Sequence, residues 1–399
     1  MAVWPKLKWD KEPAGPLKGI KVVDMTSVVL GPFATLQLAD LGAEVIKVEN
    51  NDSNTQGDIM RHAGKCPAQG MGPIFAALNR NKKTINLNAK KPDDADVLTA
   101  LLSGADVFIH NVRMAGMERL GFGYEAVKTI NPNIIYVHCA GFGSGGEYGK
   151  LQAYDDLIQA ASGFAALSEQ RDGGRPAFSP SLIADKVCGL FAAQAVMAAI
   201  IARQNGNGGQ FVQMPMFEAF TWFNMVENLW GETYIPGTGK MGYTRSVNPN
   251  RRPYPTADGY IAIVPYNDAQ WIRYFELCDR PGVFDDPRFS TYEERAKHVG
   301  ELYAIIEEVS ATKTTQEWMT VLSQNNIPSM PYSTMKDVLT DPHLQQVGFF
   351  EERESPVTGK YRSMRHPILY QGTPVHTYAH PPSPDADGDE IRAALMQCL

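Results

Sequence analysis

Hydrophobic residues along residues 1–219 recur with strand-like spacing in some stretches and helix-like spacing in others. The runs Ile20–Met25 and Val45–Val48 are short and rich in β-branched residues, which predicts two strands. The stretch between them, Pro32–Leu41, has the spacing of a helix, with Pro32 near its start and Gly42 just after its end. A strand, a helix and a strand at this spacing predict a right-handed βαβ unit with parallel strands.

The same alternation continues as far as residue 219 and predicts the fold class. Further strands are expected at Thr84–Leu87, Val107–His110, Ile134–Cys139 and Gln210–Met214, with helices between them. We therefore expect an α/β fold with a Rossmann-like large domain and a mostly parallel sheet. The turn after the first strand reads TSVVLGP and lacks the glycines of a GxGxxG loop, which argues against a dinucleotide-dependent dehydrogenase.

A long helix is expected within residues 179–203, and a single acid, Asp185, lies at its head. The apolar residues that follow leave hardly any polar face, so we expect this helix to be buried inside the large domain. The free N–H groups at a helix N-terminus favour a negative charge, and we expect them to keep Asp185 ionised. On spacing alone, the simpler alternative is that Asp185 is an ordinary helix N-cap.

The pattern changes after Glu218 and indicates a second domain. The stretch Phe220–Trp230 is aromatic and helical, and Thr256–Val264 predicts a hairpin around the Asp258-Gly259 turn. Helices are expected at Asp268–Leu277, Tyr292–Ser310 and Thr315–Gln324. We expect a large domain over residues 1–219, a linker over 220–240, a smaller α+β domain over 241–324, and a segment over 325–399 that returns to the large domain.

Charge, hydropathy and cysteine spacing narrow the function classes. The net charge is −7 with no basic tract, so no nucleic-acid partner is expected. The most apolar stretch, Val187–Ile201, is shorter than a membrane span, so no membrane partner is expected. The five cysteines show no CxxC spacing, which favours a reducing cytoplasm and argues against a metal site or a disulfide framework. The Gly-rich turn Gly141–Gly149 lacks the following Lys-Ser or Lys-Thr of a P-loop, and we interpret it as a mobile loop over an active site.

Several longer motifs follow one another in a recognisable order. They are LKGIKVVDMTSVVLGPFATLQLADLGAEVIKVE, LNRNKKTINLN, ADVFIHNVRMAGMERLGFGYE, NPNIIYVHCAGFG, AYDDLIQAASG, IADKVCG and PTADGYIAI. In this order the chain resembles the class III CoA-transferases over nearly its whole length, a family that includes formyl-CoA transferase, carnitine CoA-transferase and α-methylacyl-CoA racemase. The resemblance implies an interlocked homodimer, acyl-CoA and a carboxylic acid as substrates, and neither a permanently bound cofactor nor a metal.

The resemblance also assigns candidate site residues. Asp185 matches the family's catalytic aspartate. Positions that match contacts to CoA or to the thioester are Val28, Leu87, Asn111, Arg119, Leu120 and Tyr154. Without the resemblance, the three apolar residues among them would be assigned to core packing, Asn111 to a strand-end cap and Arg119 to a solvated charge. An aspartate carboxylate can attack a thioester, so the implied reaction passes through an aspartyl anhydride and an aspartyl-CoA thioester.

Departures from the family pattern bear on the substrates. Val29, Asn50 and Gln152 replace a Gln, an Arg and a Lys of formyl-CoA transferase, which argues against the formyl and oxalate pair. The segment NPNRRPYP lies where that enzyme has a glycine loop, and it brings Arg251 and Arg252. These arginines predict either a small dicarboxylic acid as acceptor or contacts to CoA phosphate. The alternative activity, an acyl-CoA racemase, needs a histidine where this chain has Tyr154.

Overall fold

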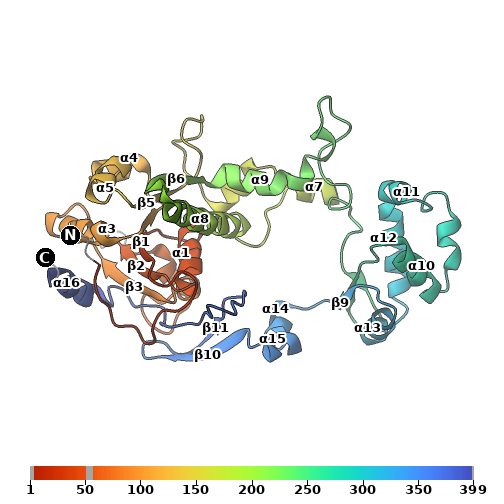
Figure 1. Ribbon diagram of the computed structural model, residues 1–399. Helices are drawn as coiled ribbons and strands as arrows, with labels where there is room; N and C mark the ends of the chain where they lie inside the picture. Colours follow the sequence, from red (N-terminus) through yellow and green to blue (C-terminus); the bar gives the residue numbers. More distant parts are fainter. Residues whose placement is uncertain (1–3, 51–56, 398–399) are drawn as a thin grey trace. The chain divides into compact units, whose positions relative to one another are not determined.

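Strand β1 (Lys21–Met25), helix α1 (Leu30–Asp40) and strand β2 (Glu44–Glu49) form the predicted βαβ unit in the computed structural model, which describes residues 4–50 and 57–397 (Figure 1). The two strands are parallel, with Val22 opposite Val45. Both valines are fully buried. Helices cover parallel sheets on both faces, which is why their strands are continuous apolar runs.

Four more strands complete a fully parallel six-stranded sheet. They are β3 (Lys82–Asn86), β4 (Val107–His110), β5 (Ile135–Ala140) and β6 (Gln210–Pro215). The strand order is β3-β2-β1-β4-β5-β6, which is the order of a Rossmann fold. The α/β fold with a mostly parallel sheet is thereby confirmed. The direction of strand addition reverses between β1 and β4, and ligands of such sheets bind at the carboxyl ends of the strands at this point.

Helices surround this sheet, and the end of the chain joins them. They are α2 (Pro73–Leu78), α3 (Pro92–Gly104), α4 (Met114–Arg119), α5 (Tyr124–Ile130), α6 (Asp155–Ala161), α8 (Ile183–Ala202) and α16 (Gly388–Met396), with short turns at Ile59–His62 and Arg203–Asn207. Helix α16 lies against α3 and β3, and its Ile391 and Leu395 join the same core as Val23 and Phe108 (Figure 1). A hairpin of β10 (Phe350–Ser355) and β11 (Gly359–Met364) precedes it.

Helix α8 differs from its prediction in two respects. Leu182 takes the N-cap position and Asp185 is the third helical residue, so the N-cap alternative is wrong. The helix buries mainly small residues, while Leu190 and Ile201 are 52% and 58% exposed, so it is not buried all round. Together with the following turn, Ile183–Asn207 is long and apolar enough, by length and composition alone, to cross a membrane, which corrects the expectation that this stretch is too short. Half of its apolar window is buried, and it packs against α1, α6, β5 and β6.

A second compact unit comprises Gly163–Phe178 and Phe223–Leu344. Its core contains Trp318, Tyr274, Phe275 and Ile306. The predicted hairpin is present as β7 (Tyr254–Pro255) and β8 (Tyr260–Ile263), and β9 (Ser329–Pro331) pairs with β8. Its helices are α7 (Ala166–Asp172), α10 (Asp268–Leu277), α11 (Tyr292–Lys297), α12 (Val299–Ser310), α13 (Thr315–Gln324) and α14 (Met335–Val338), with short turns at Trp230–Glu232 and Pro281–Asp285.

The division of the chain differs in detail from the predicted domain boundaries. The first unit runs to Ser162, resumes over Ser179–Trp222, and returns from Gln345 onwards. Residues 163–178 therefore belong to the second unit although they fall inside the predicted large domain. Helices α9 (Met216–Asn228) and α15 (Pro342–Gln346) span two of the four points where the chain passes between the units.

Candidate active site

Two of the predicted ligand-binding residues meet at the point where the strand order reverses. Asn111 directly follows β4, and the loop Thr26–Val29 directly follows β1. The Asn111 side chain donates to the Ser27 carbonyl oxygen at 2.9 Å and accepts from the Ser27 N–H at 3.2 Å. Asn111 therefore fixes the loop that carries Val28, and a position at the carboxyl end of the strands is where α/β sheets bind ligands.

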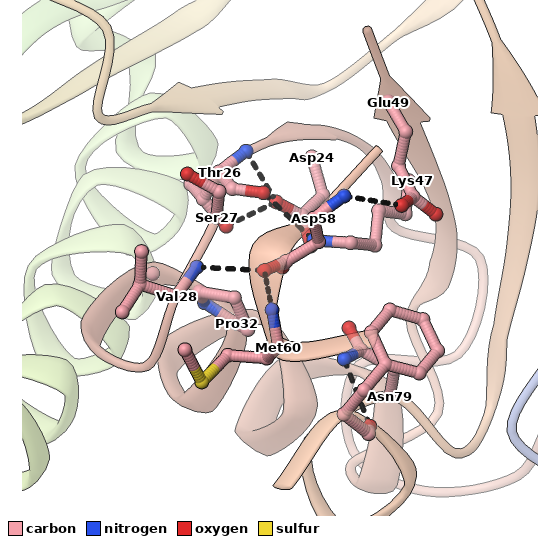
Figure 2. A network of polar contacts seen from close by, with 12 residues as sticks. Asp24, Thr26, Ser27, Val28, Pro32, Lys47, Glu49, Asp58, Met60 and Asn79 are labelled. Carbon is pink, nitrogen blue, oxygen red and sulfur yellow. Dashed lines mark hydrogen bonds and ion pairs between the residues drawn. The ribbon is translucent and has the colours of Figure 1, made fainter. Parts of the chain in front are cut away.

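Val28 is held in an uncommon backbone conformation. Its φ angle is +74°, which is a genuine outlier for a β-branched residue and costs of order 1–3 kcal/mol. The Val28 N–H donates to Asp58 Oδ1 at 3.1 Å, and Asp58 Oδ2 lies 3.1 Å from Lys47 Nζ. Lys47 in turn donates to the Thr26 carbonyl oxygen at 2.7 Å (Figure 2). A strained residue persists only where the surrounding contacts enforce its conformation, as they do for Val28. Because the strain lowers stability, its retention indicates a functional role for this loop.

The charges beneath this loop form a buried network (Figure 2). Lys47 and Asp24 are both fully buried. Burial alone would lower the pKa of Lys47, but Asp24, Asp58 and Glu49 outweigh it and hold that pKa above its ordinary value. Arg61 neutralises Glu49 from the other side, with its Nε 2.8 Å from Glu49 Oε2. Buried charge pairs of this kind are costly to break, and through Asp58 and Lys47 they hold the loop above them in place.

Asp185 is positioned by a second carboxyl group, that of Asp155. The Asp185 N–H donates to Asp155 Oδ1 at 3.0 Å. The other oxygen of Asp155 accepts from Gln159 Nε2 at 2.6 Å, and Gln159 Oε1 accepts from the Ser179 N–H at 2.8 Å. Asp155 and Gln159 are both buried, at the start and middle of α6. They therefore fix both the start of α8 and the segment leading into it.

The environment of Asp185 changes its acidity in the direction opposite to the prediction. Burial, followed by the nearby charge of Asp155, raises the pKa of Asp185 to about 7. The expectation that the helix N-terminus keeps it ionised as an ordinary aspartate is therefore wrong, because its own N–H is used by Asp155 and its carboxyl group is partly buried. A carboxyl group with a pKa near neutrality is a stronger nucleophile once ionised than an ordinary aspartate, and such shifts are typical of functional sites.

Helix α8 approaches α1 closely one turn after Asp185. A side chain at Gly189 would meet the Leu30 carbonyl oxygen at 2.8 Å, so only glycine permits this contact. Residues four apart lie on the same face of a helix, which places Asp185 on the face that packs against α1. Leu30 is the first residue of α1 and directly follows the loop Thr26–Val29.

The remaining predicted residues are more scattered. Tyr154 precedes α6 and is 59% exposed. Arg119 ends α4 and is exposed, and Leu120 packs partly against the core of the first unit. Leu87 lies inside that core at 1% exposure, so its side chain packs among apolar residues, and its contact with CoA stays a prediction. Its backbone N–H is also used, by the Glu49 carbonyl oxygen at 2.9 Å.

Four backbone N–H groups of the Gly-rich turn Gly141–Gly149 have hydrogen-bond partners in the structure. The Gly143 N–H donates to Glu218 Oε1 at 2.8 Å, and the Ser144 N–H donates to Gln213 Oε1 at 3.1 Å. Gly146 and Gly149 donate to carbonyl oxygens within the turn. These four N–H groups are therefore occupied, and the turn is tied to β6 and α9.

Arg251 and Arg252 lie in the second unit. Both are exposed and line a cavity of about 760 Å³ whose walls include Tyr254 and Trp271. Among the residues that the structure describes, no group of three or more His, Cys, Asp or Glu side chains is arranged to hold a metal ion.

Sequence reasoning missed Asp155 and Asp58 as parts of the site. Asp155 follows the predicted Tyr154 directly, and an acid at the start of an amphipathic helix is usually a solvated first-turn charge. The signal that could have identified it is the Gln four residues later, which indicates a bonded pair on one helix face. Asp58 lies in a polar segment whose sequence gives no comparable signal.

The family model described as CoA-transferase family III matches residues 17–388 of the chain. The chain therefore belongs to this family and is a class III CoA-transferase. Among its relatives is the succinate–glutarate CoA-transferase of Agrobacterium fabrum, 29% identical over 90% of both chains. The human succinyl-CoA:glutarate CoA-transferase is 30% identical over 86% of this chain and 78% of its own length. A formyl-CoA:oxalate CoA-transferase of Escherichia coli is 30% identical over 89% of this chain and 90% of its own.

Solved structures agree with this assignment. A CAIB/BAIF family protein from Brucella suis matches with a TM-score of 0.79 and 28% identity, covering 96% of this chain and 100% of its own. A protein from Mycobacterium tuberculosis matches with a TM-score of 0.80 and 28% identity, covering 95% of this chain and 99% of its own.

Proposed function

We propose that this enzyme moves CoA from an acyl-CoA to a short dicarboxylic acid, with Asp185 as the covalent nucleophile. The observation that carries the proposal is the environment of Asp185, a partly buried carboxyl group with a pKa of about 7, positioned through its N–H by the buried Asp155. A solvated N-cap would need neither burial nor a second carboxyl group.

The proposed reaction consists of four acyl transfers that together release and consume no proton. A carboxylate oxygen of Asp185 attacks the donor thioester, the C–S bond breaks, and CoA leaves as thiolate from a mixed anhydride. The thiolate attacks the aspartyl carbonyl carbon, which releases the donor acid and leaves an aspartyl-CoA thioester. The acceptor carboxylate attacks this thioester to form a second anhydride. CoA thiolate then attacks the acceptor carbonyl, which gives the new acyl-CoA and regenerates the Asp185 carboxylate.

Two observations support a short diacid as acceptor. Relatives from Agrobacterium fabrum, human and mouse are named for succinate or succinyl-CoA and glutarate, all of which involve a short dicarboxylic acid. Arg251 and Arg252 line an aromatic cavity and are the predicted partners of the second carboxylate. The loss of three polar or charged residues found in formyl-CoA transferase, at Val29, Asn50 and Gln152, argues against formate and oxalate.

The test combines substrate choice with trapping of the intermediate. The purified enzyme is incubated with succinyl-CoA and either glutarate, butyrate or oxalate, and the CoA esters are measured by mass spectrometry. We expect glutaryl-CoA to form fastest, and we expect hydroxylamine to trap a modification on the peptide that contains Asp185. Asp185→Ala should fold and lose transfer; a rate within about tenfold of wild type, or roughly 1.4 kcal/mol of barrier, would show that Asp185 is not the nucleophile.

A further inference from the structure

The cavity of the second unit contains an excess of positive charge. The charged residues that line it are Arg245, Arg251, Arg252, Arg295 and Glu227. Arg295 is compensated, because it forms an ion pair with Asp268. Within residues 4–50 and 57–397, the ion pairs of the structure include none with Arg245, Arg251 or Arg252. Arg252 interacts with the exposed carboxylate of Asp172 and helps to lower the pKa of that group, after Arg171. Arg245 and Arg251 therefore have no ion-pair partner among the described residues, and Glu227 supplies the carboxyl group of the largely aromatic lining.

Arg245 differs from the other two by being held in place. Its Nε donates to the Tyr303 hydroxyl at 2.9 Å, and Tyr303 is itself buried at 6% exposure in the core of the second unit. Arg245 is partly buried, whereas Arg251 and Arg252 are exposed. The Tyr243 side chain also hydrogen-bonds to Arg245. Hydroxyl partners orient a guanidinium group without neutralising it, so Arg245 keeps its charge and, of its five N–H donors, has others to offer an anion.

A preoriented and partly buried guanidinium group binds an anion better than an exposed one. Less side-chain entropy is lost on binding, and the charge-assisted hydrogen bonds are stronger where water is partly excluded. The size of the cavity, about 760 Å³, lies within the range of small-molecule sites. The aromatic and aliphatic walls, including Tyr254, Ile263 and Trp271, suit a short methylene chain, and Glu227 disfavours a polyanion such as the phosphates of CoA.

We propose that Arg245 is the specificity-determining cation of this cavity and binds one carboxylate of a short dicarboxylic acid. The proposal rests on the proposed function in one respect, namely that the acceptor is a diacid. It concerns binding within the second unit and is independent of the role of Asp185.

The test measures binding without turnover, by titration calorimetry on the full-length protein. The probes are glutarate, its monomethyl ester and free CoA, each titrated into wild type, Arg245→Gln and Arg273→Gln. Arg273 is the matched control, because it is a half-exposed arginine on α10, outside the cavity, that pairs with Glu276. We expect Arg245→Gln to raise the Kd for glutarate by about tenfold or more, as for loss of a charge-assisted pair, while the Kd for CoA changes less than about twofold.

The ester and a second variant make the test sharper. Monomethyl glutarate should bind wild type about as weakly as glutarate binds Arg245→Gln, because each lacks one half of the same pair. Tyr303→Phe keeps the buried ring and removes only the hydroxyl, so it should weaken glutarate binding by a smaller factor and remains informative if Arg245→Gln fails to fold. Weaker binding of CoA to Arg245→Gln would assign the arginine to the cofactor, and unchanged or absent glutarate binding would overturn the proposal. Failure of CoA transfer to diacids with intact glutarate binding would instead refute the proposed function.

Discussion

The raised pKa of Asp185 has a consequence for stability that can be measured separately from activity. The change is Asp185→Asn, which keeps the size and shape of the side chain and removes its charge. In the unfolded chain the carboxyl group ionises near its ordinary pKa of 3.8, whereas burial and Asp155 raise the pKa to about 7 in the folded protein. Between these two values the folded state holds a proton that the unfolded state has lost, so the stability of wild type falls as pH rises through this window.

The magnitude follows from the same two values. The difference between 3.8 and about 7 corresponds to about 4 kcal/mol at 1.36 kcal/mol per pKa unit. Above pH 7 the whole penalty applies to wild type, and below pH 3.8 none of it does. Asp185→Asn avoids the penalty, so its free energy of unfolding should exceed that of wild type by up to about 4 kcal/mol at pH 8 and by almost nothing near pH 4. For 399 residues, an unfolding entropy of about 2.1 cal/mol/K per residue makes each kcal/mol correspond to roughly 1 °C in Tm.

The measurement is the difference in unfolding free energy between variant and wild type in guanidinium chloride, at pH 8 and again at pH 4.5. Asp156→Asn is the matched control, because Asp156 lies in the first turn of α6 and is exposed. We expect the control to show no change in stability that depends on pH. An Asp185→Asn variant that is no more stable than wild type at pH 8, or equally stabilised at both pH values, would refute the reasoning.

The value of kcat/KM should fall on the acid side of about pH 7, where Asp185 becomes protonated. Asp155→Asn should move this fall to lower pH by removing the neighbouring charge. An unchanged pH profile in Asp155→Asn would contradict the electrostatic coupling between Asp155 and Asp185. Lys47→Met should cost about 3–5 kcal/mol of unfolding free energy by leaving Asp58 buried without its ion-pair partner, while Asp24 keeps its ion pair with Lys82. Lys128→Met on the exposed side of α5 should cost less than about 0.5 kcal/mol. In deuterated water the enzyme should not exchange the α-proton of a 2-methylacyl-CoA, because Tyr154 stands where a racemase needs a histidine; exchange as fast as CoA transfer would favour the racemase alternative. If the homodimer implied by the family resemblance is interlocked, separately purified tagged and untagged protein should not exchange subunits on mixing. The exposed apolar side chains of Leu190, Ile201 and Trp222 are consistent with a partner surface. Rapid exchange, or a monomer at micromolar concentration, would refute the interlocked dimer.

The sequence by itself determined the class of fold and the family. The strands at Val107–His110 and Gln210–Met214 and the hairpin at Asp258-Gly259 were predictable because strand and turn formation depend on neighbours within a few residues. The ordered motifs then identified the family, and with it Asp185 as a candidate. Local structure was mispredicted at element ends and at His298, where the single predicted helix over Tyr292–Ser310 is broken in two. The hairpin of β10 and β11 and helix α16 were not predicted.

Only the tertiary structure decided how the candidate residues behave. The pKa of Asp185 depends on Asp155, and the strained conformation of Val28 is held by Asp58. In each pair the two residues lie 30 positions apart in the sequence. The side chain of Leu87, a predicted CoA contact, lies in the core, and α8 was expected to be buried but exposes Leu190. Periodicity records which residues are apolar, but burial and electrostatic coupling depend on which elements pack together. The packing of the layers sets the distances between charged groups and the burial of each side chain. The local pattern of residues does not specify them.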